Sequence, residues 1–113
     1  MSKIYKILTH TEWEAANKLG HVKTELDHRD GFIHCSTAKQ LPLTLHFYFK
    51  KEKSLVLCEI EERNLNRSEY LFEKALSDNR SEQYFPHIYG KLGIEQISLI
   101  EAYKFNLSPL TKL

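Results

Sequence analysis

Two histidines stand in short apolar motifs whose residue types could build a chemical site. The first motif is Gly-Phe-Ile-His-Cys-Ser at residues 31–36, and the second is Phe-Pro-His-Ile-Tyr-Gly at residues 85–90. An imidazole among bulky apolar neighbours costs stability unless it finds hydrogen-bond partners. Because histidine also binds ligands and moves protons near neutral pH, we expect the two motifs to mark a pocket.

Alternation along a strand decides which side chains of the first motif act together. Period two places His34 and Ser36 on one face with Phe32, and it turns Cys35 to the other face. This separation argues against a cysteine–histidine nucleophile pair. Gly31 lets the backbone approach closely, which favours a site, although a structural histidine is the alternative. Ser36 could cap the following helix or offer its hydroxyl to a ligand.

Proline and glycine bracket the second motif. Pro86 has no N–H to donate, so the motif is predicted to form a sheet edge or a turn rather than a central strand. If the chain is locally extended, His87 and Tyr89 share a face. An imidazole and a phenol together can bind a ribose, a phosphate or a planar ring, or move a proton. The alternative is a packed tyrosine beside a histidine at the solvent edge.

Composition excludes several classes of protein. The 113 residues imply one domain, 1–113, with 106–113 expected as a frayed tail. Lys+Arg 16 against Asp+Glu 15 gives a net charge of +1, which argues against a nucleic-acid partner or an anionic membrane. No apolar run approaches the ~20 residues of a membrane span, and no signal-peptide core is visible. We therefore expect a cytoplasmic protein, whose oligomeric state the sequence leaves open.

The cysteines and the remaining histidines have simple expected roles. Cys35 and Cys58 lie in apolar runs and are expected to be buried free thiols, since cytosolic disulfides are rare. His34 and His87 have no acidic or thiolate partner at metal-site spacing, so no metal is expected. The other histidines are expected on the surface or in loops: His10, His21, His28 and His46.

Hydrophobic periodicity predicts the elements that must position the motifs. A first helix is expected to open with a capping box at Thr11 and Glu14 and to stop at Gly20, and a second should run from Ser36 or Thr37 to about residue 49. Residues 21–30 read as a polar loop of the kind that often binds ligands. Strands are predicted at 4–8, 32–35, 54–60, 70–76 and 94–105. This order of elements indicates an α+β fold.

The chain resembles, from end to end, a small bacterial family known as domain of unknown function 952. Its two histidine motifs occur in the family's order. The other shared features are an Ile-Tyr-Lys-Ile strand at 4–7, the pair Glu12-Trp13, Gln40 four residues after the serine, the pair Val56-Leu57, and Phe72-Glu73.

This resemblance implies a fold and a site. The fold would be similar to that of ADP-ribosyltransferases, with a bent, split, mixed or antiparallel sheet and about two main helices. In that superfamily a histidine strand, a Ser or Thr at a strand-to-helix junction and a later polar residue surround a nicotinamide dinucleotide. The implied catalytic residues are His34, Glu73 and His87. The implied ligand-binding residues are Ser36, Gln40, Tyr89 and Lys6.

Three functions remain as hypotheses. The first is a transferase or hydrolase acting on a ribose-phosphate ligand, with NAD as a substrate. The second is a non-catalytic module that binds a nucleotide or a phosphate-containing small molecule. The third is a structural or interaction protein whose histidine motifs determine the fold. If His34 and His87 line one cleft, the first two are favoured, because one small ligand could touch both.

Overall fold

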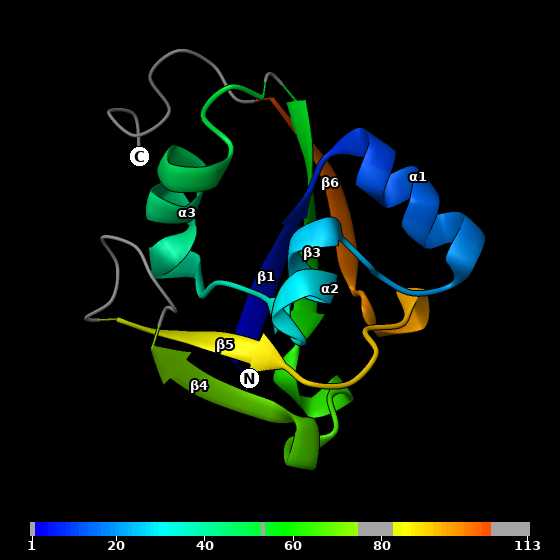
Figure 1. Ribbon diagram of the computed structural model, residues 1–113, viewed down its shortest axis with the longest axis vertical. Helices are drawn as coiled ribbons and strands as arrows, with labels where there is room; N and C mark the ends of the chain where they lie inside the picture. Colours follow the sequence, from blue (N-terminus) through cyan, green and yellow to red (C-terminus); the bar gives the residue numbers. More distant parts are fainter. Residues whose placement is uncertain (1, 53, 75–82, 105–113) are drawn as a thin grey trace.

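Two antiparallel sheets form the frame of the computed structural model, which describes residues 2–52, 54–74 and 83–104 (Figure 1). Within these ranges the fold is α+β, as predicted. The first sheet has the strand order β1-β3-β6, with β1 at Lys3–Leu8, β3 at Ser54–Glu61 and β6 at Leu99–Lys104. The second has the order β2-β5-β4, with β2 at Ile33–His34, β5 at Tyr84–Ile88 and β4 at Tyr70–Lys74. The α-helices are α1 at His10–Leu19, α2 at Glu25–Asp30 and α3 at Leu41–Tyr48.

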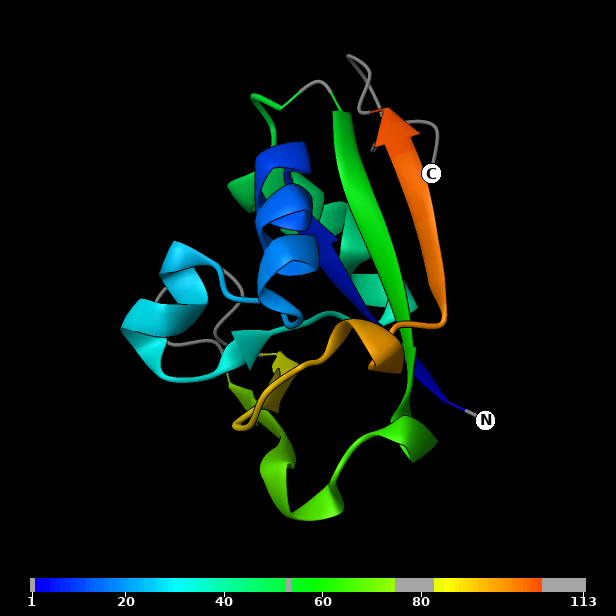
Figure 2. The same ribbon diagram turned by 90° about the vertical axis from the view of Figure 1, so that its right-hand side faces the viewer.

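A pair of backbone hydrogen bonds joins the two sheets. Tyr5 N donates to Ser36 O at 2.7 Å, and Ser36 N donates to Tyr5 O at 2.8 Å. The chain that leaves β2 therefore crosses directly onto β1, and Figure 2 shows this segment leading from one sheet to the other. The first histidine motif thus ends where the two sheets diverge.

Apolar side chains cover both faces of the first sheet. One core cluster gathers buried residues from β1, β3, β2 and β5 under helix α1, and a smaller cluster lies under α3. Figure 1 accordingly shows α1 and α3 on opposite sides of this sheet. Cys35 and Cys58 are buried free thiols, as predicted, and burial raises the pKa of each to about 12. No helix in the described part of the chain is long and apolar enough to cross a membrane.

Helix α1 begins two positions earlier than the sequence predicted. Thr9, not Thr11, is the N-cap: its Oγ1 accepts from Glu12 N at 3.1 Å, and Glu12 Oε1 accepts from Thr9 N at 2.9 Å. The prediction was wrong because Thr11 and Glu14 have the same spacing as the true capping box. Gly20, in the left-handed region at φ +92°, ends the helix as expected.

The prediction of a loop at residues 21–30 was also wrong, because Glu25–Asp30 form helix α2. Thr24 Oγ1 accepts from Asp27 N at 3.1 Å, and Gly31 closes the helix with φ +83°. The sequence therefore contains both end signals of this helix, an N-cap threonine and a closing glycine. A helix of 6 residues is too short to show an apolar period, and that missing period hid it.

Strand β5 is the central strand of its sheet, which contradicts the edge or turn predicted from Pro86. In an antiparallel strand the nitrogen and the carbonyl of one residue point to the same side, and here that side faces β2, where Cys35 N donates to Pro86 O at 3.0 Å. The β2 ladder pairs only His34 with His87 and Ile33 with Ile88. Pro86 therefore accepts the bond from Cys35 but has no N–H to return to Cys35 O, and the β2 ladder ends at His34. On the β4 side no N–H of Pro86 is needed, because its nitrogen points away from that strand.

Other boundaries differ modestly from the prediction. The second helix is split into a 3-10 turn, Ala38–Gln40, and α3. Strand β6 begins at Leu99, after a 3-10 turn at Ile94–Gln96 that the sequence had placed in the strand. Three parts of the predictions lie outside the described residues: residues 75 and 76 of the strand predicted at 70–76, residue 105 of the strand predicted at 94–105, and the predicted tail at 106–113.

The capping geometry yields the first test. Thr9→Ala should lower the free energy of unfolding by about 1 kcal/mol, because the N–H of Glu12 loses its side-chain acceptor. Thr11→Ala, at an exposed position in the same turn, is the control and should stay within about 0.5 kcal/mol of wild type. Urea unfolding followed by circular dichroism measures both, and equal losses would contradict the assignment of the cap.

Candidate functional site

Strand register brings both histidine motifs onto one face of the second sheet. His34 of β2 pairs directly with His87 of β5, and their ring centroids lie 5.7 Å apart. Because side chains alternate along a strand, the same face carries Phe32 beside His34, Tyr89 beside His87, and Glu73 from β4. These five residues are called the histidine face below.

Phe32 contacts three of the other four residues of the histidine face. Its ring stacks on His87 with the centroids 4.0 Å apart, and it lies 4.5 Å from the ring of His34 and 5.3 Å from that of Tyr89. The phenylalanine is buried, so its ring fixes the positions of the three polar rings around it. Sequence reasoning did not assign Phe32 to the site, although period two had already placed it beside His34.

Glu73 joins the second motif through a shared oxygen. Tyr89 donates its hydroxyl to Glu73 Oε1 at 2.6 Å, and His87 Nδ1 lies 2.8 Å from the same atom. The hydrogen bond from Tyr89, followed by that from His87, lowers the pKa of Glu73, so its carboxyl group is ionised at neutral pH. His87 is buried while Tyr89 is exposed, the reverse of the sequence alternative that put the histidine at the solvent edge.

The surroundings of His87 determine where its imidazole ring carries a proton. Burial lowers the pKa of this imidazole and outweighs the opposing hydrogen bond to Glu73. The ionised carboxylate can only accept, so a neutral ring places its proton on Nδ1. The second nitrogen, Nε2, is then an acceptor and has the electronic form required of a general base.

His34 is held by two aspartates of helix α2. Its Nδ1 lies 2.6 Å from Asp27 Oδ1, and its Nε2 lies 2.9 Å from Asp30 Oδ2. Its backbone N–H also donates to Asp27 Oδ1 at 3.0 Å. Both ring contacts are hydrogen bonds at once only when both nitrogens carry protons, because an ionised carboxylate cannot donate. Sequence reasoning missed both aspartates, since it placed them in a loop.

Lys6 completes a partly buried polar network with Asp27, His34 and Asp30. Its Nζ lies 2.8 Å from Asp27 Oδ2 in an ion pair whose angle falls outside hydrogen-bond geometry, and it donates to His34 O at 2.9 Å. Burial alone would raise the pKa of Asp27. The charge of Lys6 and the hydrogen bonds from His34 outweigh burial and hold the pKa at about 2. The network ties β1, α2 and β2 together beneath the histidine face.

The two remaining predicted ligand contacts are occupied by the protein itself. Ser36 Oγ and Thr44 Oγ1 are 2.8 Å apart, and Ser36 does not cap the helix. Thr37 and Gln40 form the capping box there instead, and Gln40 Nε2 donates to Tyr84 O at 2.7 Å. Gln40 therefore ties the helical turn to β5.

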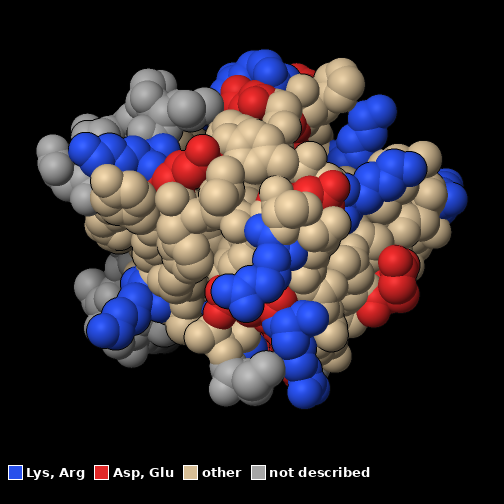
Figure 3. Space-filling view, turned by 90° about the horizontal axis from the view of Figure 1, so that it is seen from below, with Lys and Arg blue, Asp and Glu red and all other residues tan. Residues whose placement is uncertain are grey.

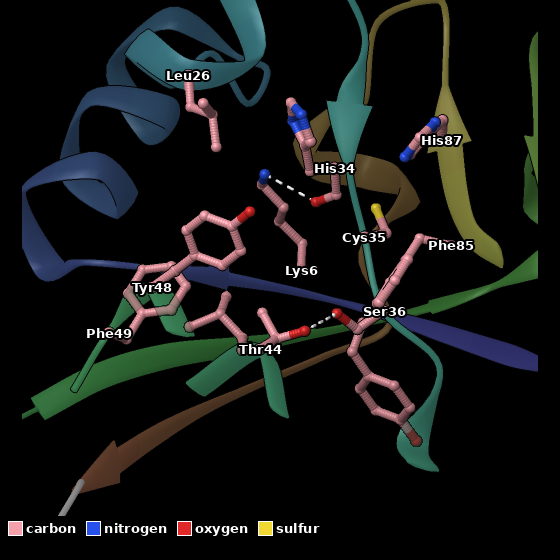
Figure 4. A pocket seen from close by; sticks show the side chains of 12 residues that line it. Lys6, Leu26, His34, Cys35, Ser36, Thr44, Tyr48, Phe49, Phe85 and His87 are labelled. Atoms are coloured by element: carbon pink, nitrogen blue, oxygen red, sulfur yellow. Dashed lines mark hydrogen bonds between the residues drawn. The ribbon is translucent and has the colours of Figure 1, made fainter. Parts of the chain in front are cut away.

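A small cavity of about 70 Å³ adjoins the histidine face. Figure 4 shows His34, His87, Lys6, Ser36 and Cys35 around it. This space accepts one small group of a ligand, and a larger ligand would have to extend across the exposed side of the face. Within the described ranges no group of three or more His, Cys, Asp or Glu residues could hold a metal ion.

Removing the central charge of the network gives the second test. Asp27→Asn should lower the free energy of unfolding by about 3–5 kcal/mol, because it leaves the buried ammonium group of Lys6 without its counter-ion. Glu25→Gln, an exposed change on the same helix, should stay within about 0.5 kcal/mol of wild type.

The same aspartate predicts a pH dependence. Its pKa falls from 3.8 to about 2 on folding, so its stabilisation is present above pH 4 and is lost as the pH falls toward 2. The lowered pKa contributes about 2 kcal/mol to the free energy of unfolding. Urea unfolding at a series of acidic pH values measures it as the difference between wild type and Asp27→Asn. In Lys6→Met, the loss of stability on acidification should begin at a higher pH than in wild type, because the charge that lowers the pKa of Asp27 is gone. Identical acid limbs in all three proteins would contradict the assignment.

The chain is similar in sequence and structure to one family. Residues 7–100 match the family model described as "Protein of unknown function (DUF952)". The crystal structure of protein CC0527 from Caulobacter crescentus superposes with a TM-score of 0.83 at 30% identity, over 93% of this chain and 89% of that one. A crystal structure of its double mutant gives 0.81 at 30% identity over the same shares, and its solution NMR structure gives 0.74 at 29% identity over 94% and 88%. No curated protein matches the chain. The chain therefore belongs to the DUF952 family, as its two histidine motifs predicted.

Proposed function

We propose that this protein binds a ribose-phosphate ligand of the NAD type at the histidine face and cleaves or transfers its ribosyl group. The observation that carries the proposal is Glu73, a half-exposed, ionised carboxylate held by Tyr89 and His87. The two joined sheets also support a relation to the ADP-ribosyltransferase fold, which the sequence resemblance implied.

The carboxylate would act on the charge that develops in the reaction. The bond between the ribose C1′ and the nicotinamide nitrogen breaks, and its electron pair goes to nitrogen, so nicotinamide leaves as a neutral molecule. Positive charge then develops on the ribosyl group. Glu73 would stabilise that charge, and such electrostatic stabilisation is a large contribution in a site that excludes water.

The neighbouring residues would complete the reaction. Water or an acceptor hydroxyl attacks C1′, and His87 Nε2 takes the proton that the attacking oxygen loses. The exposed ring of Tyr89 would pack against a planar group of the ligand. His34, with contacts at both ring nitrogens, would position the face rather than transfer a proton.

A specific observation favours the second candidate, a non-catalytic nucleotide- or phosphate-binding module. His34 has both nitrogens engaged, and Ser36 and Gln40 each have a partner within the protein. Three of the residues implied for the site therefore hold the structure together. Such a site could retain ligand binding without turnover.

Nicotinamide release from NAD, measured by liquid chromatography, tests the proposal. Wild type should release nicotinamide, and Glu73→Gln should lower kcat by about 100-fold or more, because the charge is removed while the shape is kept. Glu14→Gln, an exposed change on α1 that removes the same charge, should leave kcat unchanged.

A thermal-shift measurement separates the two candidates. Saturating NAD, at about 100 times its Kd, should stabilise the protein by ~2.7 kcal/mol. A thermal shift without nicotinamide release would support the binding module. The absence of both would contradict the two candidates together.

A further inference from the structure

A second hollow, of about 210 Å³, also touches Phe32. Four basic residues line it: His21, Lys23, His28 and Lys91. Gly31 and Gly90 line it as well, and no side chain lies within 4 Å of the position a Cβ of Gly31 would take. The name two-lysine hollow is used for it below.

Chain pairing brings together the two segments that carry the lysines. His21 forms an isolated antiparallel bridge with Gly93, and Val22 N donates to Leu92 O at 2.8 Å. Lys23 and Lys91 each lie one position beyond this contact, and both line the hollow. Two like charges that line one hollow repel each other, and such repulsion between neighbouring segments is destabilising.

Neither lysine has an acidic partner to offset this repulsion. Across the described ranges, no ion pair joins Lys23 or Lys91 to a carboxylate. Asp27 borders the hollow, but its two oxygens are engaged by His34 and Lys6. The carboxylate of Glu69 lies against Gly90 and pairs with neither lysine. The hollow therefore presents two lysines that have no ion-pair partner among the described residues.

We propose that the two-lysine hollow binds the phosphate or diphosphate group of the ligand whose ribose lies at the histidine face. An anion between the two ammonium groups would offset their repulsion and form charge-assisted hydrogen bonds. The two sites are neighbours: Phe32 belongs to the histidine face and lines the hollow, and Gly90 and Lys91 directly follow Tyr89 in the chain. The identity of the ligand rests on the proposed function, whereas the anion site rests on the lysine geometry.

The charge pattern favours a compact anion over a nucleic acid. On the face shown in Figure 3, Lys and Arg side chains are interspersed with Asp and Glu and separated by uncharged surface. The net charge of the chain is only +1. A long nucleic acid requires an extended basic surface, whereas one phosphate group needs only a few donors.

Isothermal titration calorimetry with inorganic pyrophosphate tests the anion site. The double variant Lys23→Gln/Lys91→Gln should bind pyrophosphate at least about tenfold more weakly than wild type, because two charge-assisted contacts are removed. The control Lys18→Gln/Lys51→Gln changes two exposed lysines outside the hollow and should bind as wild type does. Without pyrophosphate, the Lys23→Gln/Lys91→Gln protein should melt at a higher temperature than wild type, because the repulsion is gone.

The outcomes separate this inference from the proposed function. No pyrophosphate binding by wild type, or equal binding by the Lys23→Gln/Lys91→Gln variant, would overturn the anion site. Glu73→Gln should still bind pyrophosphate, since Glu73 does not line the hollow. Absence of nicotinamide release together with lysine-dependent pyrophosphate binding would contradict the proposed reaction and support the anion site. ADP-ribose should compete with pyrophosphate, and simultaneous binding of both would overturn the claim of one shared ligand.

Discussion

The buried ion pair between Lys6 and Asp27 is the constraint on which the site depends. Lys6 comes from the first sheet and Asp27 from helix α2, and His34 of the second sheet is bonded to both. Losing one partner of a buried pair is costly, whereas replacing the whole pair with apolar residues is often neutral. We infer that the network serves to position the two sheets relative to each other rather than to add net stability. It fixes the angle at which the histidine face meets the first sheet.

Phe32 carries that constraint into the functional surface. Its ring packs against the rings of His34, His87 and Tyr89, and the residue also lines the two-lysine hollow. A ligand with a ribose at Glu73 and a phosphate at the hollow would therefore bind to two surfaces that are held in place by one buried residue. Preorganisation of this kind reduces the entropy lost on binding. The buried thiols contribute packing alone, since burial raises their pKa values to about 12.

Local patterns predicted the strands and the grouping of side chains, but contacts between distant segments were beyond them. Period two correctly separated His34 from Cys35, because alternation depends only on neighbouring residues. The role of Asp27 was missed because helix α2 is too short for a period and because Lys6, its partner, lies far away in the sequence. Pro86 misled the prediction of β5 for a related reason. Its carbonyl still accepts from Cys35 N, so the central strand loses only one bond, at the point where the β2 ladder ends.

Histidine ring resonances followed by NMR during titration with ADP-ribose test the central claim most directly, because they report on the histidine face itself. The account predicts that the signals of His34 and His87 shift together with one Kd, while those of His10 and His46, on helices α1 and α3 outside both hollows, do not. Unchanged His34 and His87 signals at about millimolar ADP-ribose, or shifts confined to His10 and His46, would contradict it.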